Sequence, residues 1–299
     1  MDRHELLAKI TTLPLAARGL AEDLLSGDFR SVFKGQGIEF DEVRRYETGD
    51  DIRSIDWNVS ARFGTPYVKM YREEREMTVC LILDNSASMH SASGPLSRWE
   101  QGVMAAALIA FSAEQAGQRV SAVFFDREIR TIFPPRKGRP HTMAMISAAL
   151  EARPQERGSG LGSALTGAGR FLKRRSLAVI VSDFLCVDWE QEIGRLSRKH
   201  DVIALGITSP LDREMPDGGL LTLEDPETGV RLRAPSSFPS FRSAWASWHG
   251  ERRRLWEAIC RRSGAAWMEL STGEDAPAAL LRYFRGRRQP GGPEAHGGV

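Results

Sequence analysis

Short apolar runs separated by longer amphipathic stretches dominate the chain after residue 75. Three of these runs contain almost no polar residue: TVCLIL (78–83), SLAVIVS (176–182) and DVIALGIT (201–208). Strands that are apolar on both faces occur where helices cover both sides of a parallel sheet. The pattern therefore predicts an α/β fold in which the sheet forms the middle layer of the domain.

The segments around these runs complete the expected sheet. RVSAVFFD followed by EIRTIF predicts a hairpin that turns at residues 126–128, and a last strand is expected at 265–270. Helices are expected at residues 98–118, 141–152, 160–175, 188–199, 238–263 and 275–285. We expect a doubly wound, mostly parallel six-stranded sheet with helices on both faces, as in Rossmann-like folds.

The region before residue 76 has a different character. Its first 25 residues predict short amphipathic helices broken near Pro14, and the polar segment that follows has too few apolar residues for a core of its own. We interpret residues 1–75 as an N-terminal helical and extended arm docked on a main domain at 76–287. Residues 210–236 are expected to form a hairpin insertion, and the Gly/Pro-rich residues 288–299 a disordered tail.

Composition limits the class of protein. The chain has 299 residues, 41% of them hydrophobic, and a net charge of +2, which does not indicate a dedicated nucleic-acid binder. Its three cysteines form no CxxC pair, which favours reduced thiols. The longest apolar run, residues 103–111, is about half of the roughly 20 residues that span a bilayer. We expect a cytoplasmic protein with no membrane span and no nucleic-acid partner.

The expected helix at 238–263 is rich in tryptophan and arginine. Trp245, Trp248, Leu255 and Ile259 follow helical spacing, which is typical of a stripe that faces the core. An aromatic nucleic-acid surface is the alternative interpretation. We favour the core-facing stripe.

The stretch LDNSASM (83–89) follows the first apolar strand and places three oxygen side chains, Asp84, Ser86 and Ser88, at every second position. Ligands of open α/β sheets bind beyond the carboxyl ends of the strands. Ser159, in the Gly-rich loop RGSGLGSAL, and Asp183, after the second apolar strand, are expected at that same edge. Hard oxygen donors without His or Cys favour Mg²⁺ or Ca²⁺ over zinc or copper. For the motif taken alone, turn formation by Asp84 is the alternative.

This constellation resembles the metal-ion-dependent adhesion site of von Willebrand factor A domains, over about residues 78–285. The resemblance implies that Ser86, Ser88 and a third hydroxyl bind Mg²⁺ (or Ca²⁺ or Mn²⁺) directly, and that Asp84 and Asp183 bind it mainly through water. The third hydroxyl is expected to be Ser159, with Ser163 as the alternative. Hydroxyls leave the ion electropositive, so an acidic residue of a protein partner could complete its coordination.

The segment KGQGIEFDEVRRYETGDDIRSIDWNVSARFGTPYVKM, which begins at residue 34, is similar to the signature of the bacterial domain of unknown function 58 family. The matching residues are Gly35, Gly37, Glu39, Phe40, Arg44, Tyr46, Gly49, Asp50, Arg53, Asp56, Trp57, Ala61, Arg62, Val68 and Lys69. The resemblance implies association with a MoxR-type AAA+ ATPase. It also implies a role in assembly, maturation or chaperoning of protein complexes.

The charged part of this segment allows two interpretations. Its side chains could bind a partner or an ion, or they could pair internally and dock the arm on the main domain. We favour docking because the segment lacks a core. The residues concerned are Arg44, Tyr46, Asp50, Asp51, Arg53, Asp56, Trp57 and Arg62.

The sequence assembles no convincing catalytic constellation. Asp84 followed by Asn85 and Ser86 does not match the Asp-x-Asp pattern of aspartyl-phosphate phosphatases, Ser88 has no GxSxG context, and only His90 and His141 fall near the expected site. We predict a non-enzymatic, metal-dependent protein–protein interaction module or adaptor. A metal-dependent hydrolase that uses the same site, or a structural module in which that site has lost its role, remain the alternatives.

Overall fold

The computed structural model describes residues 39–72, 77–92 and 94–286, together with six single positions before residue 21. The helices expected in the first 25 residues and the tail expected at 288–299 lie almost wholly outside the described residues. The chain divides into two units: residues 31–76 form the smaller one, and residues 1–30 with 77–299 form the larger one.

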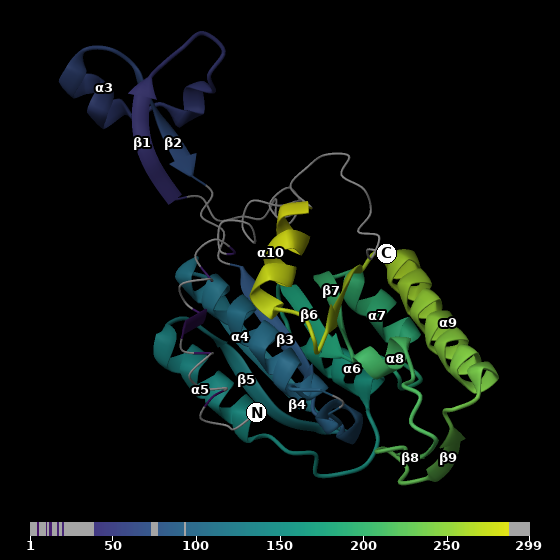
Figure 1. Cartoon of the computed structure of the whole chain (residues 1–299). Helices are drawn as coiled ribbons and strands as arrows, with labels where there is room; N and C mark the ends of the chain where they lie inside the picture. The colour runs from purple at the N-terminus through teal and green to yellow at the C-terminus, as the bar shows by residue number, and fades with distance from the viewer. Residues whose placement is uncertain are drawn as a thin grey trace. The chain divides into compact units, whose positions relative to one another are not determined.

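A six-stranded sheet forms the middle of the larger unit (Figure 1). In spatial order the strands are β10 (Ala266–Ser271), β7 (Asp201–Thr208), β6 (Leu177–Ser182), β3 (Thr78–Asp84), β4 (Arg119–Phe125) and β5 (Ile129–Arg136). Neighbouring strands are parallel except β4 and β5, which form the antiparallel hairpin at one edge. The predicted mostly parallel α/β sheet is confirmed.

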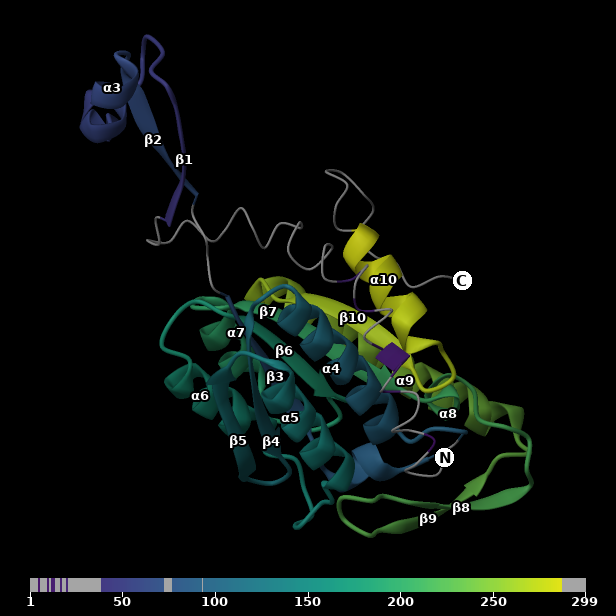
Figure 2. The same cartoon turned by 90° about the vertical axis from the view of Figure 1, so that its left-hand side faces the viewer.

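Helices cover both faces of this sheet. They are α4 (Arg98–Gln115), α5 (Arg139–Glu151), α6 (Leu161–Phe171), α7 (Glu190–Ser197), α8 (Pro210–Arg213), α9 (Pro239–Ser263) and α10 (Ala276–Gly286). Figures 1 and 2 show α4, α5 and α10 on one face and α6, α7 and α9 on the other. Because both faces are covered, all six residues of β6 are buried, as its uninterrupted apolar sequence requires.

Helix α4 packs closely against the sheet, which explains why its sequence is rich in alanine. A Cβ on Gly102 would lie 2.9 Å from Cγ1 of Val181, so the helix backbone approaches β6 closely. The helix begins with a capping box in which Ser97 and Glu100 satisfy each other's backbone N–H groups. Small side chains thus allow a helix that is buried on nearly every side.

The predicted stripe on α9 is wrong at two of its four positions. Trp248 is 49% exposed and Leu255 is 58% exposed, whereas Trp256, which the stripe omits, is 8% exposed. The ring of Trp256 lies 3.0 Å from the place of a Cβ on Gly206 of β7. The helix is therefore rotated so that Trp256 and Ile259 pack on the sheet, and Trp248 faces outward.

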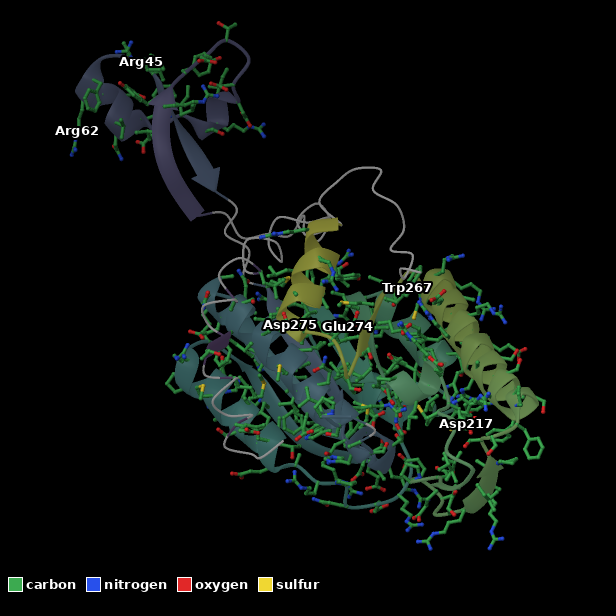
Figure 3. The ribbon with its side chains drawn as sticks, in the orientation of Figure 1. Arg45, Arg62, Asp217, Trp267, Glu274 and Asp275 are labelled. Atoms are coloured by element: carbon green, nitrogen blue, oxygen red, sulfur yellow. The ribbon has the colours of Figure 1, made fainter. Side chains whose placement is uncertain are left out.

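The predicted hairpin insertion forms a separate two-stranded sheet. Strand β8 (Leu220–Glu224) pairs antiparallel with β9 (Arg231–Pro235), and helix α8 precedes them. Asp217, labelled in Figure 3, lies just before β8 and pairs with Arg242 of α9 at 3.5 Å. The insertion thus joins the end of β7 to α9.

In the smaller unit, β1 (Glu39–Arg45) pairs antiparallel with β2 (Tyr67–Arg72), and η1 (Ile52–Ser54) and α3 (Trp57–Phe63) lie between them in the chain. Figure 3 labels Arg45 on β1 and Arg62 on α3. Among the described side chains of this unit only Ser60 and Val68 are buried. This agrees with the expectation that the segment has no core of its own.

Candidate metal-binding site

The carboxyl edge of the sheet brings together the five residues predicted to hold a metal. Asp84 is the last residue of β3, and Ser86 and Ser88 follow it in the loop that contains the short helix η2 (Ala87–His90). Strands β3 and β6 are parallel neighbours with Leu83 opposite Val181, which brings Ser182 next to Asp84 and places Asp183 one residue further along. Ser159 reaches the same place from the loop that precedes α6.

Asp84 forms the centre of this arrangement. Its Oδ2 accepts hydrogen bonds from the hydroxyls of Ser182 at 2.6 Å and Ser159 at 3.0 Å, and its Oδ1 accepts the backbone N–H of Ser86 at 3.0 Å. The side chain is fully buried. Burial, together with the nearby carboxylate of Asp183, raises the pKa of Asp84 to about 7, although hydrogen bonds from Ser182 and Ser86 oppose the shift.

Asp183 is the second carboxylate, and its two oxygens have different surroundings. Oδ1 accepts the backbone N–H of Leu185 at 3.0 Å, whereas Oδ2 is shielded from solvent and has no hydrogen-bond partner among the described residues. Burial raises the pKa of Asp183, and the positive charge of Arg98 opposes that shift. A buried carboxylate oxygen without a partner is costly, so the site favours a cation at this point.

The two hydroxyls of the DNSAS stretch lie close enough to face one ion. Ser86 Oγ and Ser88 Oγ are 3.1 Å apart and both residues are buried. The alternation read from the sequence is therefore retained although the loop contains a turn of 3₁₀ helix rather than extended chain. The two serines and Asp84 converge as the sequence pattern predicts.

Arg98, the first residue of α4, holds the loop in place. Its Nη2 contacts both carboxylate oxygens of Asp212 in α8 at 2.6 and 2.9 Å, and its Nη1 donates to the carbonyl of Ser88 at 3.3 Å and to Ser91 Oγ at 3.2 Å. Both charged side chains are largely buried. The pair therefore ties the serine loop to the insertion that follows β7.

The two histidines near the expected site have other contacts. His90 Nε2 hydrogen-bonds to Asn85 Oδ1 at 2.8 Å, and its ring stacks on Trp99 at 5.3 Å. Burial lowers the pKa of His90 to about 4, so the imidazole is neutral at pH 7. His141 contacts the carbonyl of Val120 at 3.1 Å, near the beginning of β4 and hence at the opposite edge of the sheet.

The turn of the β8–β9 hairpin also reaches the site. Glu227 accepts the backbone N–H of Ser88 at 2.7 Å through Oε1 and that of Gly158 at 2.6 Å through Oε2. Its carboxylate therefore bridges the two loops that carry Ser88 and Ser159. A groove of about 970 Å³ extends from these loops between the hairpin and α9, and Asp183, Trp245 and Trp248 are among its lining residues.

Ser163, the alternative third hydroxyl, lies in the first turn of α6 and is exposed. Three residues at the site were not predicted: Ser182, Arg98 and Glu227. Ser182 directly precedes Asp183 at the end of a buried strand, and that position was a usable signal. Arg98 and Glu227 reach the site from a helix and an insertion, and no sequence spacing relates either of them to Asp84.

The predicted residues of the smaller unit serve local structure. Arg44 forms a two-pronged ion pair with Asp50, with N–O distances of 2.8 and 2.6 Å, and this hydrogen bonding lowers the pKa of Asp50. Asp51 caps η1 by accepting the N–H of Arg53, and Asp56 caps α3. Internal pairing is thus present, while docking of this unit on the larger one stays a prediction.

The apolar and aromatic side chains of the smaller unit differ in exposure. Tyr46 is half-buried, and its backbone N–H donates to the carbonyl of Pro66 at 3.0 Å. Trp57 is 68% exposed, and Ile52 and Phe63 are exposed to a similar degree. Three large apolar side chains therefore lie on the surface of a small unit.

The donor set fits a hard divalent cation. Among the described residues no three His, Cys, Asp or Glu side chains are grouped to hold a metal, so an ion here would depend on the hydroxyls of Ser86, Ser88 and Ser159. Oxygen donors of this kind suit Mg²⁺, which keeps several waters and takes only one or two carboxylates. Two neighbouring carboxylates with raised pKa values, one of which has a shielded oxygen without a partner among the described residues, would gain most from such a charge.

The chain belongs to the family described as "Protein of unknown function DUF58", which matches residues 42–254. An uncharacterized protein of Mycobacterium tuberculosis is 32% identical over 292 residues, which are 97% of this chain and 92% of the relative. An uncharacterized protein of Mycobacterium bovis matches to the same extent.

Two solved structures resemble the larger part of the chain. An aerotolerance-related membrane protein from Bacteroides fragilis matches with 16% identity and a TM-score of 0.49, covering 70% of this chain and 98% of the other. BatB from Bacteroides thetaiotaomicron, a conserved hypothetical protein, matches with 15% identity and a TM-score of 0.48, covering 71% and 98%. Within the described part of this chain, no helix has the length and hydropathy that would let it cross a membrane.

Proposed function

We propose that this protein is a metal-dependent protein-recognition module. In this proposal Mg²⁺ binds at the carboxyl edge of the sheet, held by the hydroxyls of Ser86, Ser88 and Ser159 and, mainly through water, by Asp84 and Asp183. An acidic side chain of a protein partner completes the coordination of the ion. The module works in the cytoplasm with a MoxR-type AAA+ ATPase in the assembly or maturation of other complexes.

The observation that carries the proposal is the convergence of hydroxyls on the buried carboxylate of Asp84, next to the half-buried side chain of Asp183. Ser159 and Ser182 both donate to Asp84 Oδ2, while Asp183 Oδ2 has no partner in the described structure. A divalent cation is attracted by the pair of carboxylates, but the hydroxyls that would bind it directly are neutral and the carboxylates would act mainly through water, so the ion keeps residual positive charge on its open side. Recognition of a carboxylate follows from that residual charge.

The alternative of a hydrolase requires a base beside the site. His90 is neutral but already bonded to Asn85 and stacked on Trp99, and these contacts suit a structural role. The choice of ATPase follows from what the resemblance of residues 34–70 implies. The groove beside the site provides the space for a partner segment.

The proposal is tested by capture of a purified MoxR-type ATPase, and of client complexes, on the immobilised full-length protein. Because the ATPase itself needs Mg²⁺, its capture is compared between variants at constant Mg²⁺. Capture of client complexes is compared with Mg²⁺ and with chelator in the wash buffer. Asp84→Ala is expected to abolish capture, and Ser163→Ala, on the exposed face of α6, is expected to leave it unchanged. Equal capture by wild type and a folded Asp84→Ala variant would contradict the proposal, as would turnover of phosphoester or peptide substrates by the isolated chain.

A further inference from the structure

The chain carries an acidic side chain of its own, Glu227, against the two loops that supply the hydroxyls of the proposed ion site. Glu227 accepts one backbone N–H from each of the two loops that supply the hydroxyls, Ser88 N at 2.7 Å and Gly158 N at 2.6 Å. These donors are 139 and 69 residues away in sequence. A carboxylate that accepts two amide hydrogen bonds makes charge-assisted contacts, which are stronger than neutral ones.

The hairpin turn is built to present this carboxylate. Asp225 Oδ1 accepts the N–H of Glu227 at 3.0 Å, and its Oδ2 accepts the hydroxyl of Thr228 at 2.6 Å. Gly229 closes the turn with a φ of +74°, a conformation that favours glycine, and its N–H donates to the carbonyl of Asp225 at 2.7 Å. Hydrogen bonds within the turn therefore hold the backbone of Glu227 in place independently of its contacts with the two loops.

The strands that carry this turn are weakly covered. Leu220, Val230 and Leu232 are between 54% and 66% exposed, and the pair between Glu224 and Arg231 lies in solvent. At its base the hairpin is held by Ser236, whose hydroxyl accepts the N–H of Gly218 and donates to the carbonyl of Gly219. A two-stranded hairpin has little stability of its own, so the contacts of Glu227 contribute strongly to its closed position.

The surroundings of Glu227 are those of a ligand that can be replaced. Glu227 is half-buried and lines the groove, whereas Asp84 is fully buried. The hydrogen bonds of Glu227 come from backbone N–H groups, which can donate to any carboxylate of suitable reach.

We infer that Glu227 is an internal ligand that occupies the carboxylate position of the recognition site, and that a partner's acidic side chain binds by displacing it as the β8–β9 hairpin opens. The inference rests on the proposed function in one respect: the group that displaces Glu227 is a glutamate or aspartate of a protein partner. The apparent affinity for partners is then the affinity of the open form multiplied by the fraction of molecules in which the hairpin is open.

The first experiment measures the closed state without metal or partner. Amide hydrogen exchange is followed at Ser88 and Gly158 in the wild type, in Glu227→Gln and in Glu227→Ala. The matched control is Glu224→Gln, which removes a carboxylate from the same hairpin but not from the site. Exchange at least tenfold faster in both Glu227 variants, with the control unchanged, is expected. Unchanged exchange in the Glu227 variants would overturn the inference.

The second experiment tests displacement with a defined probe, a labelled synthetic peptide LLTLEDPETGVRLRAP that repeats residues 220–235. Fluorescence anisotropy is expected to show at least tenfold tighter binding to full-length Glu227→Ala than to the wild type. The same peptide with alanine in place of its second glutamate is expected to lose this preference. Equal affinity for the two proteins, including no binding to either, would overturn the inference.

The two proposals fail in distinguishable ways. If the peptide prefers Glu227→Ala equally with Mg²⁺ and with chelator, the internal ligand is supported and the metal dependence is contradicted. If Asp84→Ala abolishes partner capture while Glu227→Ala changes neither exchange nor peptide binding, the metal-dependent recognition is supported and the internal ligand is contradicted.

Discussion

The hydroxyl of Ser159 lies 3.0 Å from Oδ2 of Asp84, although 75 residues separate the two in sequence. This hydrogen bond ties the loop before α6 to the end of β3, and it places Ser159 rather than the exposed Ser163 at the buried carboxylate. The relationship makes the metal hypothesis testable by a pair of serine variants that differ only in position.

We expect Mg²⁺ to raise the melting temperature of the wild type, because a ligand that binds only the folded state stabilises it. At a hundredfold excess over Kd the gain is about 2.7 kcal/mol, which corresponds to roughly 5 °C for a chain of this size. Asp84→Ala is expected to remove the response, Ser159→Ala to reduce it, and Ser163→Ala to retain it. The measurement is a thermal melt with and without Mg²⁺, and a full response in Asp84→Ala would contradict the assignment.

Without metal, Asp84 is expected to make stability fall as the pH rises. Burial raises its folded-state pKa to about 7 from an ordinary value of 3.8, so the folded protein keeps a proton that the unfolded chain loses. The stabilisation is fully present below pH 4 and is lost as the pH rises through 7.

Comparison of the wild type with Asp84→Asn isolates this effect. The comparison is needed because burial lowers the pKa of His90 to about 4. The contribution of His90 to the free energy of unfolding therefore changes with pH in the opposite direction, and it is lost as the pH falls from about 6.5 to 4. Denaturant unfolding with chelator, from pH 4 to 7, is expected to show the free energy of wild type declining relative to the variant. A constant difference between the two proteins would count against a raised pKa at Asp84.

A glycine in the same loop provides a further test. A Cβ on Gly160 would lie 2.1 Å from the carbonyl oxygen of Arg127, and its own N–H already donates to the carbonyl of Asp126 at 2.7 Å. Gly160→Ala must therefore displace the loop and move Ser159 away from Asp84. We expect a loss of about 2 kcal/mol or more, as for other overpacked sites, together with a weaker Mg²⁺ response.

Gly169→Ala is the matched control for this substitution. Gly169 lies in α6, and a Cβ there would meet only Cδ1 of Leu196, at an ordinary 3.6 Å. Replacing a helical glycine with alanine is expected to leave stability unchanged or to raise it by up to about 1 kcal/mol. Chemical denaturation measures both variants, and equal stabilities would show that the loop before α6 can yield without cost.

The sheet and five metal candidates were predictable because their signals are local. Uninterrupted runs such as LAVIVS have no alternative to a doubly covered strand, and residues that follow parallel strands must meet at one edge. Glu227 could not be predicted, because its place depends on how far an insertion folds back over the sheet. The orientation of α9 was missed for a related reason: Trp248 and Trp256 have equal hydropathy, and only the space above Gly206 decides which of them is buried.

The ion pair between Arg98 and Asp212 is expected to be the most sensitive charged contact around the site. The side chains are only 10% and 15% exposed, and Arg98 also donates to the carbonyl of Ser88. Arg98→Met leaves the carboxylate of Asp212 buried without its partner, which typically costs about 3–5 kcal/mol. Since the double variant Arg98→Met, Asp212→Leu buries no such charge, we expect it to be more stable than either single variant.

Arg231→Met provides the comparison for that prediction, because its pair with Glu224 is 71% and 44% exposed and exposed pairs contribute about 1 kcal/mol or less. Urea unfolding of Arg98→Met, of Asp212→Leu and of the double variant gives the coupling energy between Arg98 and Asp212. Urea unfolding of Arg231→Met gives the cost of losing an exposed pair. A coupling energy near zero, or equal costs for Arg98→Met and Arg231→Met, would mean that the serine loop holds its position without Arg98.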